Sequence, residues 1–367
     1  MVPQELARAC ILLAMALLCE ALTSDDFCRQ TSYLQGPPLN DEFPQDRIVA
    51  IGDVHGSLSS LLHVLFKAGI VVSDSVCEWS SESPPTLLVQ TGDVVDRGPS
   101  SLESWRCLSN LQAKSRLMGA KHNVVRLLGN HELLWLIGDT VYKNTAHDTP
   151  DVVKELTQQI KEDIMAGNVV GAFAVDPAFK GHRILFSHAG LRPQMYNQLS
   201  ARISQSRGER MTTPTARDLA LFINTKLLFD VNRCAAIGAR CMLKDAIYGV
   251  GAERGGYEVG GCFWTDWSVL QKSKPVDEGL TQVVGHSLEK STIRSLPNVE
   301  AICIDVALYL NGQGYLELTS AGHFVAHEKR KRGWHARDLT QEACIRRTNE
   351  TKRNETKRNE TKRNEMK

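Results

Sequence analysis

The sequence Ile-Val-Ala-Ile-Gly-Asp-Val-His-Gly occupies residues 48–56 and is the clearest structural signal in the chain. Four apolar residues predict a short strand, and the turn after it carries Asp53 and His55 between glycines. Apolar residues then recur at helical spacing from residue 58 to 66, after Ser57 as a predicted N-cap. A strand, a polar turn and a helix in this order are typical of an α/β domain.

The same arrangement recurs along the chain. Apolar runs at residues 86–90, 123–128, 183–186 and 281–284 each end in a turn that carries Asp, Asn or His. Strands that are separated by helical stretches predict an α/β sheet, and sites in such sheets form at the carboxyl ends of the strands. We therefore expect the turns to bring together Asp53, His55, Asp93, Asn130, His188 and His286.

These six side chains are two carboxylates, one amide and three imidazoles. This mixture of oxygen and nitrogen donors suits Mn, Fe or Zn. A carboxylate shared between two ions holds them roughly 3.5–4 Å apart, as in hydrolases that activate a water molecule at neutral pH. A single histidine is more often structural, but six potential ligands at five strand ends favour a site for two divalent metal ions.

The motifs around these residues resemble a known family signature. They are Gly-Asp-Val-His-Gly at 52–56, Gly-Asp-Val-Val-Asp-Arg-Gly at 92–98, Gly-Asn-His-Glu at 129–132, and the His188 and His286 motifs. In this order they resemble the metallophosphoesterases, and within them the phosphoprotein phosphatase branch. Leu128 before the third motif and Ala189 in the fourth make the resemblance closest to the Shewanella-like protein phosphatases. The resemblance implies a calcineurin-like sandwich of two mixed β-sheets flanked by helices.

The resemblance also implies a role for each site residue. Asp53, His55 and Asp93 would hold the first ion, and Asp93 would bridge to a second ion that is completed by Asn130, His188 and His286. A hydroxide that bridges the two ions would attack phosphorus in line.

Three residues close to the metal ligands would act on the phosphate ester. His131 would protonate the leaving oxygen as a general acid, oriented by Asp96, and Arg97 would bind the phosphate. Arg192 is a candidate for a second phosphate contact, with a plain surface arginine as the alternative.

The implied function is a metal-dependent phosphomonoester hydrolase, a protein phosphatase acting on phosphotyrosine or on phosphoserine and phosphothreonine. One alternative is a dinucleoside polyphosphate hydrolase, because residues 98–103 resemble that group too. Those enzymes, however, tend to have Asp where Glu132 stands. A second alternative is an inactive secreted binding protein that has kept the fold.

Four regions are predicted along the chain. Residues 1–24 contain an apolar run at 9–19 after Arg8, which predicts a cleaved signal peptide and entry into the secretory pathway. An uncleaved anchor or an organelle signal is the alternative. A polar segment follows at 25–45, the catalytic domain is placed at 46–328, and a basic disordered tail with Asn-Glu-Thr-Lys-Arg repeats at 329–367. The repeats contain three glycosylation sequons, at Asn349, Asn354 and Asn359.

Charge and cysteine content restrict the function further. Residues 1–328 carry 29 Lys and Arg against 36 Asp and Glu, which argues against a body that binds nucleic acid. No run of 18 apolar residues exists, so no transmembrane segment is expected. The close spacing of Cys234 and Cys241 predicts a local disulfide, whereas Cys107 and Cys303 fit the pattern of buried thiols.

Overall fold

The computed structural model describes residues 46–346 except 209, 211–212, 237–239, 289–291 and 298–299. The predicted signal peptide (1–24), the polar segment (25–45) and the repeats beyond residue 346 lie outside the described residues.

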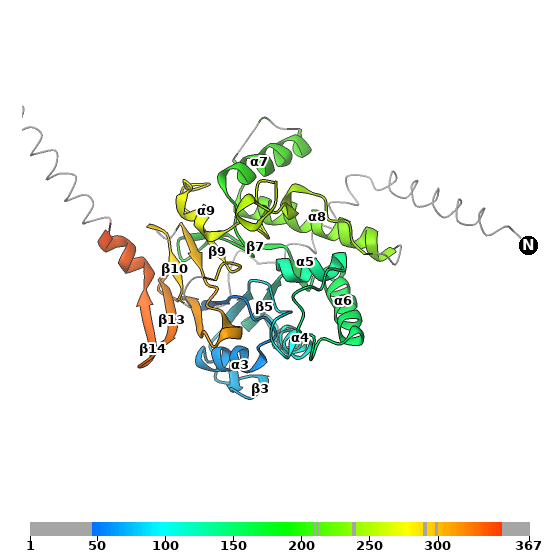
Figure 1. The fold of residues 1–367 in the computed structure, drawn as a ribbon. Helices are drawn as coiled ribbons and strands as arrows, with labels where there is room; N and C mark the ends of the chain where they lie inside the picture. Colours follow the sequence, from blue (N-terminus) through cyan, green and yellow to red (C-terminus); the bar gives the residue numbers. More distant parts are fainter. Residues whose placement is uncertain are drawn as a thin grey trace, which may run out of the picture.

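The first sheet is seven-stranded and mixed (Figure 1). Its strands, in order across the sheet, are β14 (Gly333–Asp338), β13 (Phe324–Arg330), β12 (Gly314–Leu318), β1 (Arg47–Ile51), β4 (Thr86–Gln90), β5 (His122–Leu127) and β6 (Val169–Val170). Strands β1, β4, β5 and β6 are parallel, whereas β12, β13 and β14 are antiparallel additions. Ile48 pairs with Leu318 on one side and Leu87 on the other, and the apolar run of β1 is buried because both faces of this central strand are covered.

The second sheet is five-stranded and also mixed. Its strands, in order, are β10 (Arg294–Ser295), β11 (Ala301–Cys303), β9 (Leu280–Val284), β8 (His182–Ser187) and β7 (Ala172–Phe179). Strands β8, β9 and β11 are parallel, and β7 and β10 are antiparallel edges. A separate hairpin is formed by β2 (Val71–Ser73) and β3 (Val76–Trp79).

Helices cover the outer faces of the two sheets (Figure 1). The helices are α3 (Leu58–Lys67), α4 (Ser101–Leu117), α5 (Asn130–Ile137), α6 (Pro150–Met165), α7 (Pro193–Arg207), α8 (Ala216–Ala236) and α9 (Trp267–Lys272). Helix α4 packs on β5, and α8 packs on β7 and β8. Two mixed sheets with helices outside them confirm the predicted fold class.

The predicted boundary between domain and tail needs correction. Strand β13 crosses residue 328, β14 pairs with it along its length, and residues 339–346 are helical. The basic run at 329–332 therefore lies in a hairpin at the edge of the first sheet, where long charged side chains can remain in solvent while the backbone is paired. The described part of the fold extends to residue 346.

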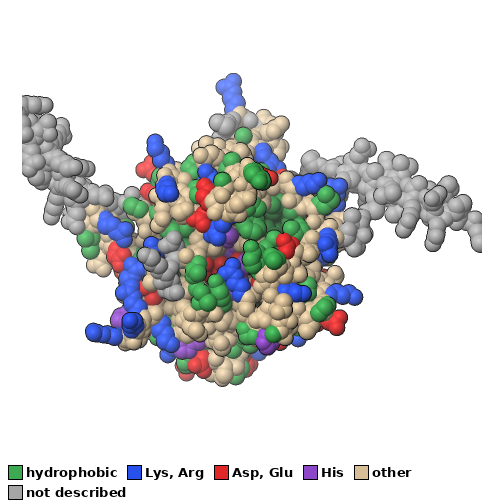
Figure 2. Space-filling model, in the orientation of Figure 1, with side chains coloured by type: hydrophobic (Ala, Val, Ile, Leu, Met, Phe, Trp, Pro, Cys, Tyr) green, Lys and Arg blue, Asp and Glu red, His purple; other side chains and the backbone are tan. Residues whose placement is uncertain are grey.

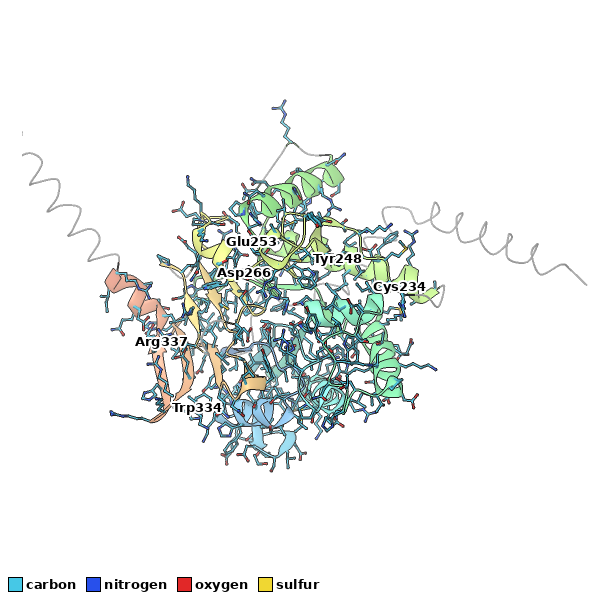
Figure 3. The ribbon with its side chains drawn as sticks, viewed as in Figure 1. Cys234, Tyr248, Glu253, Asp266, Trp334 and Arg337 are labelled. Atoms are coloured by element: carbon cyan, nitrogen blue, oxygen red, sulfur yellow. A yellow bond between two sulfur atoms is a disulfide. The ribbon has the colours of Figure 1, made fainter. Side chains whose placement is uncertain are left out.

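The prediction for Cys107 is wrong, whereas the other cysteine predictions are confirmed, including Cys303, which is a buried thiol. Cys234, at the end of α8 (Figure 3), forms a disulfide with Cys241 as predicted. Cys107 is not a buried thiol, because it forms a disulfide with Cys77 that joins α4 to β3.

In the part of the chain that the structure describes, no helix is both long enough and apolar enough to cross a membrane.

Candidate active site

Loops at the carboxyl ends of strands in both sheets meet in one place. The backbone N–H of His286, which follows β9, donates to Oδ1 of Asp53, which follows β1, at 3.0 Å. Nδ1 of His188, which follows β8, lies 2.8 Å from the carbonyl oxygen of Thr91, which follows β4. The turns therefore converge, as the strand-end motifs predict, and the structure places them at the junction between the two sheets.

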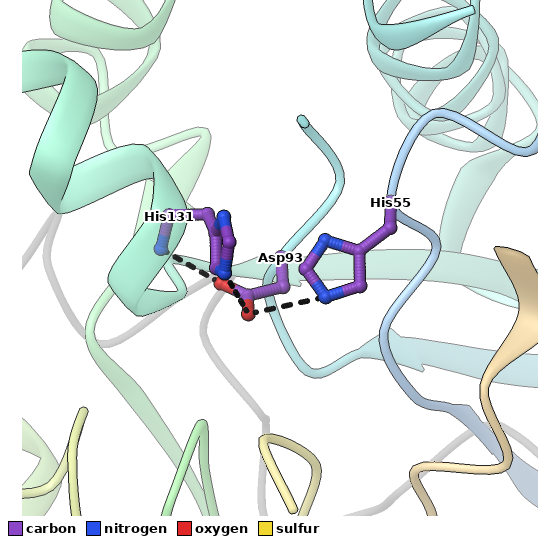
Figure 4. Close-up of side chains that lie close together, drawn as sticks. All are labelled: His55, Asp93 and His131. Atoms are coloured by element: carbon purple, nitrogen blue, oxygen red, sulfur yellow. Dashed lines mark hydrogen bonds and ion pairs between the residues drawn. The ribbon is translucent and has the colours of Figure 1, made fainter. Parts of the chain in front are cut away.

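The first group of potential metal ligands is buried at this junction (Figure 4). His55, Asp93 and His131 have ligand atoms within 4.8 Å of one another. Oδ2 of Asp93 lies 3.6 Å from Nε2 of His55 and 3.9 Å from Nε2 of His131. Oδ2 of Asp53 lies 3.9 Å from the same nitrogen of His55. The three residues predicted for the first ion are thus adjacent, with His131 beside them.

The second group shares Asp93 with the first. Asp93, His188 and His286 have ligand atoms within 4.8 Å of one another, and Nε2 of His188 lies 3.4 Å from Oδ2 of Asp93. Oδ1 of Asn130 lies 2.8 Å from both Nε2 of His188 and Nδ1 of His286. All four residues predicted for the second ion are therefore in contact, and Asp93 is placed to serve both groups.

The imidazole rings are oriented by backbone carbonyl groups. Nδ1 of His55 lies 3.0 Å from the carbonyl oxygen of Val95, and Nδ1 of His188 makes the corresponding contact to Thr91. When Nδ1–H donates in this way, Nε2 keeps its lone pair and faces the cluster. Such a hydrogen bond on the outer nitrogen is the usual arrangement of metal-binding histidines.

The backbone of the site loops adopts conformations that most residues avoid. His55, Asp93, Asp96, Arg97 and His286 all have positive φ, between 46° and 72°. A non-glycine residue in this region costs of the order of 1–3 kcal/mol, and such residues concentrate at functional sites. The surrounding fold therefore holds these side chains in place against their local preference.

Gly92 shows why the second and third motifs contain glycine. Its φ is 98°, and a Cβ atom there would lie 2.5 Å from the backbone nitrogen of Gly129. The loops after β4 and β5 can pass this closely only because neither residue has a side chain.

The electrostatics of the cluster favour bound positive charge. Burial alone would lower the pKa of His188, but the carboxylates of Asp93 and Asp53 raise it to about 9. Burial and the neighbouring Asp305 raise the pKa of Asp53 well above its ordinary value. Without bound cations, the negative charge of these buried carboxylates is balanced by protons on His188 and Asp53.

The same residues fit divalent cations. Two imidazole nitrogens and an amide oxygen face one another around Asn130, and groups with facing lone pairs repel unless a proton or a cation lies between them. Burial lowers the pKa of His55 to about 3, so its ring is neutral and available as a ligand. Oxygen and nitrogen donors in this combination suit Mn, Fe or Zn.

His131 carries the remaining chemistry of the site. Its Nδ1 lies 2.6 Å from Oδ2 of Asp96, and both side chains are buried. Nη2 of Arg97 donates to Nε2 of His131 at 3.2 Å. The structure thus places the three residues predicted for catalysis in one chain of contacts beside Asp93.

The predicted second phosphate contact, Arg192, is directed elsewhere. Its Nε donates to Gln194 and its Nη1 faces Glu253 at 3.8 Å. Arg254, next in the chain to Glu253, donates to Oγ of Ser287, beside His286, and pairs with Asp266 at 2.8 Å. Glu253 and Asp266 are both marked in Figure 3. Arg254 is therefore closer to the site than Arg192.

Sequence reasoning missed four buried or half-buried residues of the site. Glu132 accepts hydrogen bonds from four backbone N–H groups, and Trp135 donates to Asp96. The hydroxyl of Tyr309, in a short 3-10 helix (Leu308–Leu310), accepts from Nη1 of Arg97 at 2.7 Å. Asp305 is a further buried carboxylate beside Asp53, and burial raises its pKa to about 6. Only Glu132 and Trp135 had a signal in the sequence. Glu132 is the last residue of the third motif, and Trp135 lies in the apolar stretch that follows it.

One face of the molecule carries side chains of mixed charge. Figure 2 shows histidine and acidic side chains near the middle of the visible face, between hydrophobic side chains and beside basic ones.

A family model described as calcineurin-like phosphoesterase matches residues 46–231. The chain belongs to the calcineurin-like phosphoesterase family. The matched region includes the loops of Asp53, Asp93, Asn130 and His188, and His286 follows later in the chain. The family uses a dinuclear metal centre, and the two groups that share Asp93 supply residues that could bind it.

Comparisons with individual proteins agree with the family. A Shewanella-like protein phosphatase 2 of Arabidopsis thaliana is 37% identical over 117 residues, which cover 32% of this chain and 28% of that protein. A symmetrical bis(5'-nucleosyl)-tetraphosphatase of Baumannia cicadellinicola is 32% identical over 145 residues, which cover 39% of this chain and 42% of that protein. The matches thus span less than half of the length of these relatives.

The fold of this calcineurin-like phosphoesterase also has a counterpart among solved structures. The crystal structure of a cold-active protein-tyrosine phosphatase from a psychrophilic Shewanella species superposes with a TM-score of 0.51 at 18% identity, covering 77% of each chain. This likeness supports the two-sheet fold.

Proposed function

We propose that this chain is a metal-dependent phosphomonoester hydrolase that acts on phosphorylated proteins. The observation that carries the proposal is the contact of Nη2 of Arg97 with Nε2 of His131, while Nδ1 of His131 is bound to Asp96. A phosphate-binding cation and a general acid are thereby joined at the edge of two metal-ligand groups that share Asp93.

The roles of the chain's own residues follow from this arrangement. Bound divalent ions would supply Lewis acidity and an activated water molecule. The planar guanidinium of Arg97 offers two N–H groups to phosphate oxygens. When Arg97 turns toward the phosphate, Nε2 of His131 is released to carry the proton that the leaving oxygen takes. Asp96 holds the opposite nitrogen of the ring and so sets its direction.

The types of donor atom in the site favour certain divalent metals. We propose that Asp53, His55 and Asp93 hold one ion, and that Asp93, Asn130, His188 and His286 hold the other. Mn, Fe and Zn are the metals that this mixture of carboxylate, amide and imidazole donors favours.

The substrate is proposed to be a phosphoprotein or phosphopeptide. The similarity to a Shewanella-like protein phosphatase supports this class of substrate. We propose phosphotyrosine or phosphoserine and phosphothreonine as the residues that are dephosphorylated, and the assay below separates them.

A dinucleoside polyphosphate is a second candidate substrate. The similarity to a bis(5'-nucleosyl)-tetraphosphatase supports it. Glu132, in the position where that group tends to have Asp, favours the phosphoprotein instead.

The test is hydrolysis by the full chain after removal of metals with EDTA and reloading with Mn. Phosphotyrosine peptide, phosphothreonine peptide and diadenosine tetraphosphate are offered in parallel. His131→Ala should lower the rate by ~10²–10⁴-fold, as expected for loss of a general acid. His323→Ala is the matched control, because His323 also pairs with an aspartate, Asp338, but on the sheet surface. Metal-independent hydrolysis, or an unchanged rate in His131→Ala, contradicts the proposal.

We also propose that the chain enters the secretory pathway. The apolar run at residues 9–19 supports this compartment, and so do the two disulfides within the described residues, since disulfides persist in oxidising environments. Mass spectrometry of the N-terminus of protein secreted by a eukaryotic host tests it, and an intact Met1 would contradict cleavage.

A further inference from the structure

The carboxylate of Asp96 is held from two sides. Oδ2 contacts Nδ1 of His131 at 2.6 Å, and Oδ1 accepts a hydrogen bond from the indole Nε1–H of Trp135 at 2.7 Å. Trp135 lies four residues after His131 in α5, so both side chains project from the same face of this helix. Asp96, His131 and Trp135 are all buried, and Trp135 and Asp96 are each 1% exposed.

The hydrogen bond from Trp135 removes the remaining freedom of Asp96. The backbone of Asp96 is already fixed, with φ of 72° and its N–H donating to Oγ of Ser101 at 3.2 Å. With both oxygens bound, the carboxylate plane cannot rotate without breaking a buried hydrogen bond, which costs far more than breaking one in water. Indole can only donate, so Trp135 holds Asp96 without accepting a proton from it.

The orientation of Asp96 determines which nitrogen of His131 faces the substrate. Because Asp96 accepts at Nδ1, Nε2 is the nitrogen that faces Arg97, at 3.2 Å. A carboxylate that rotates would let the ring turn and move Nε2 away from the leaving oxygen. A displaced proton donor strongly lowers the rate of proton transfer to the leaving oxygen.

We propose that Trp135 is a positioning residue for the general acid, whose indole N–H fixes Asp96 so that His131 presents Nε2 to the leaving group. This inference rests on the proposed function. It makes a specific kinetic prediction, because an ester with a poor leaving group needs protonation of its oxygen much more than an ester with a good one.

The test compares phenyl phosphate, a poor leaving group, with p-nitrophenyl phosphate, a good one, in the Mn-loaded full chain. Trp135→Phe removes the N–H and keeps an aromatic ring. Its kcat on phenyl phosphate should fall by ~10-fold or more, a part of the ~10²–10⁴-fold that general acids contribute. The kcat on p-nitrophenyl phosphate should fall by less than ~3-fold, since that ester needs little proton transfer. KM and the metal content should stay as in the wild type.

Two further variants separate positioning from packing. Replacement of Trp135 by benzothienylalanine exchanges the N–H for sulfur at nearly constant shape, and it serves if the phenylalanine variant does not fold. Trp105→Phe is the matched control, because the buried indole of Trp105 also donates to a carboxylate, Asp163, at 2.9 Å, but between α4 and α6. We expect it to lower stability and to leave the ratio of the two kcat values unchanged.

An NMR measurement that does not depend on catalysis completes the test. The short contact between His131 and Asp96 should give a far-downfield ring N–H proton in the NMR spectrum of the wild-type protein. This signal should move upfield or broaden in both Trp135 variants and stay in Trp105→Phe.

The outcomes for the inference and for the proposed function are distinct. An equal fall on both esters, lost metal or an unmoved N–H signal assigns Trp135 a merely structural role and overturns the inference. Absence of metal-dependent hydrolysis in the wild type overturns the proposed function instead.

Discussion

The backbone N–H of Asp93 donates to Oε2 of Glu132 at 2.9 Å, and this bond ties the loop after β4 to the helix that follows β5. Oε2 also accepts from the N–H of Gly129, while Oε1 accepts from those of Val94 and Val95. In return, Oδ1 of Asp93 accepts from the backbone N–H of His131 at 2.9 Å. One buried carboxylate thus supports the loop that carries the shared ligand.

Glu132→Gln should loosen this support. The amide nitrogen cannot accept, so two buried N–H groups lose their partner, at ~1–3 kcal/mol each. We expect a lower free energy of unfolding together with weaker Mn binding, measured by chemical denaturation and by calorimetric titration. Glu328→Gln is the control, because Glu328 is equally buried but accepts from Ile293, next to β10. Mn affinity in Glu132→Gln that equals the wild type would contradict this role.

Asp93→Asn should remove metal from the protein while the fold persists. Asn can still accept from the N–H of His131, but it lacks the charge that both ligand groups share. Removal of a residue that only supports a metal ligand typically lowers metal affinity by ~10–100-fold. Loss of a ligand charge that two ions share should therefore lower metal affinity by ~10²-fold or more. Metal analysis of purified protein is the measurement, and two ions per chain in this variant would refute the shared role.

Tyr309→Phe should weaken phosphate binding more than turnover. The hydroxyl holds Nη1 of Arg97, and the ring packs edge-on against His55 at 5.0 Å, a contact that Phe retains. Loss of one hydrogen bond to a charged group predicts a rise in KM of ~10-fold. Tyr315→Phe, which loses a hydroxyl contact to the carbonyl of Lys67, is the control. A change in kcat alone would show that Tyr309 acts in another way.

The charge on Asp245 should raise the free energy of unfolding near neutral pH but not in acid. Burial would raise the pKa of Asp245, but hydrogen bonds from Arg202 and the backbone of Ile247 outweigh it and hold the pKa below its ordinary value. A depressed folded-state pKa stabilises the protein above the unfolded value of about 4, and this contribution is lost as the pH falls through the folded-state pKa.

The matching variant is Asp245→Asn. Its free energy of unfolding should be lower than that of the wild type near pH 7, and the difference should shrink below a pH of about 4. Urea denaturation across this range measures it. A difference that stays constant into the acid range would mean that the charge on Asp245 is not what stabilises the fold.

The metal-ligand groups could be predicted from sequence because each ligand follows a short apolar run at the end of a strand. Asp53, Asp93 and Asn130 each lie within three residues of such a strand in the first sheet. Parallel strands bring their carboxyl ends together, so their spacing along the chain does not matter.

Other features could not be predicted because they depend on contacts that a linear pattern does not encode. The bond from Trp135 to Asp96 needs both the α5 helix and the positive φ of Asp96. The Cys77–Cys107 disulfide needs β3 to lie against α4. Strand β14, with the sequence Gly-Trp-His-Ala-Arg-Asp, has no apolar run that would predict a strand, and its position is determined by backbone pairing with β13.

The hydrogen bond from His286 to Asp53 joins residues that are 233 positions apart in the chain. Strand β1, which leads to Asp53, also needs β12 as its neighbour, and β12 is among the last strands to be synthesised. A chain still emerging from the ribosome therefore holds every ligand of the first group but lacks the partners that fix Asp53. We therefore expect the metal-ligand groups to be complete only after β12 has been synthesised, so a chain that ends before β12 should bind Mn more weakly than the full chain.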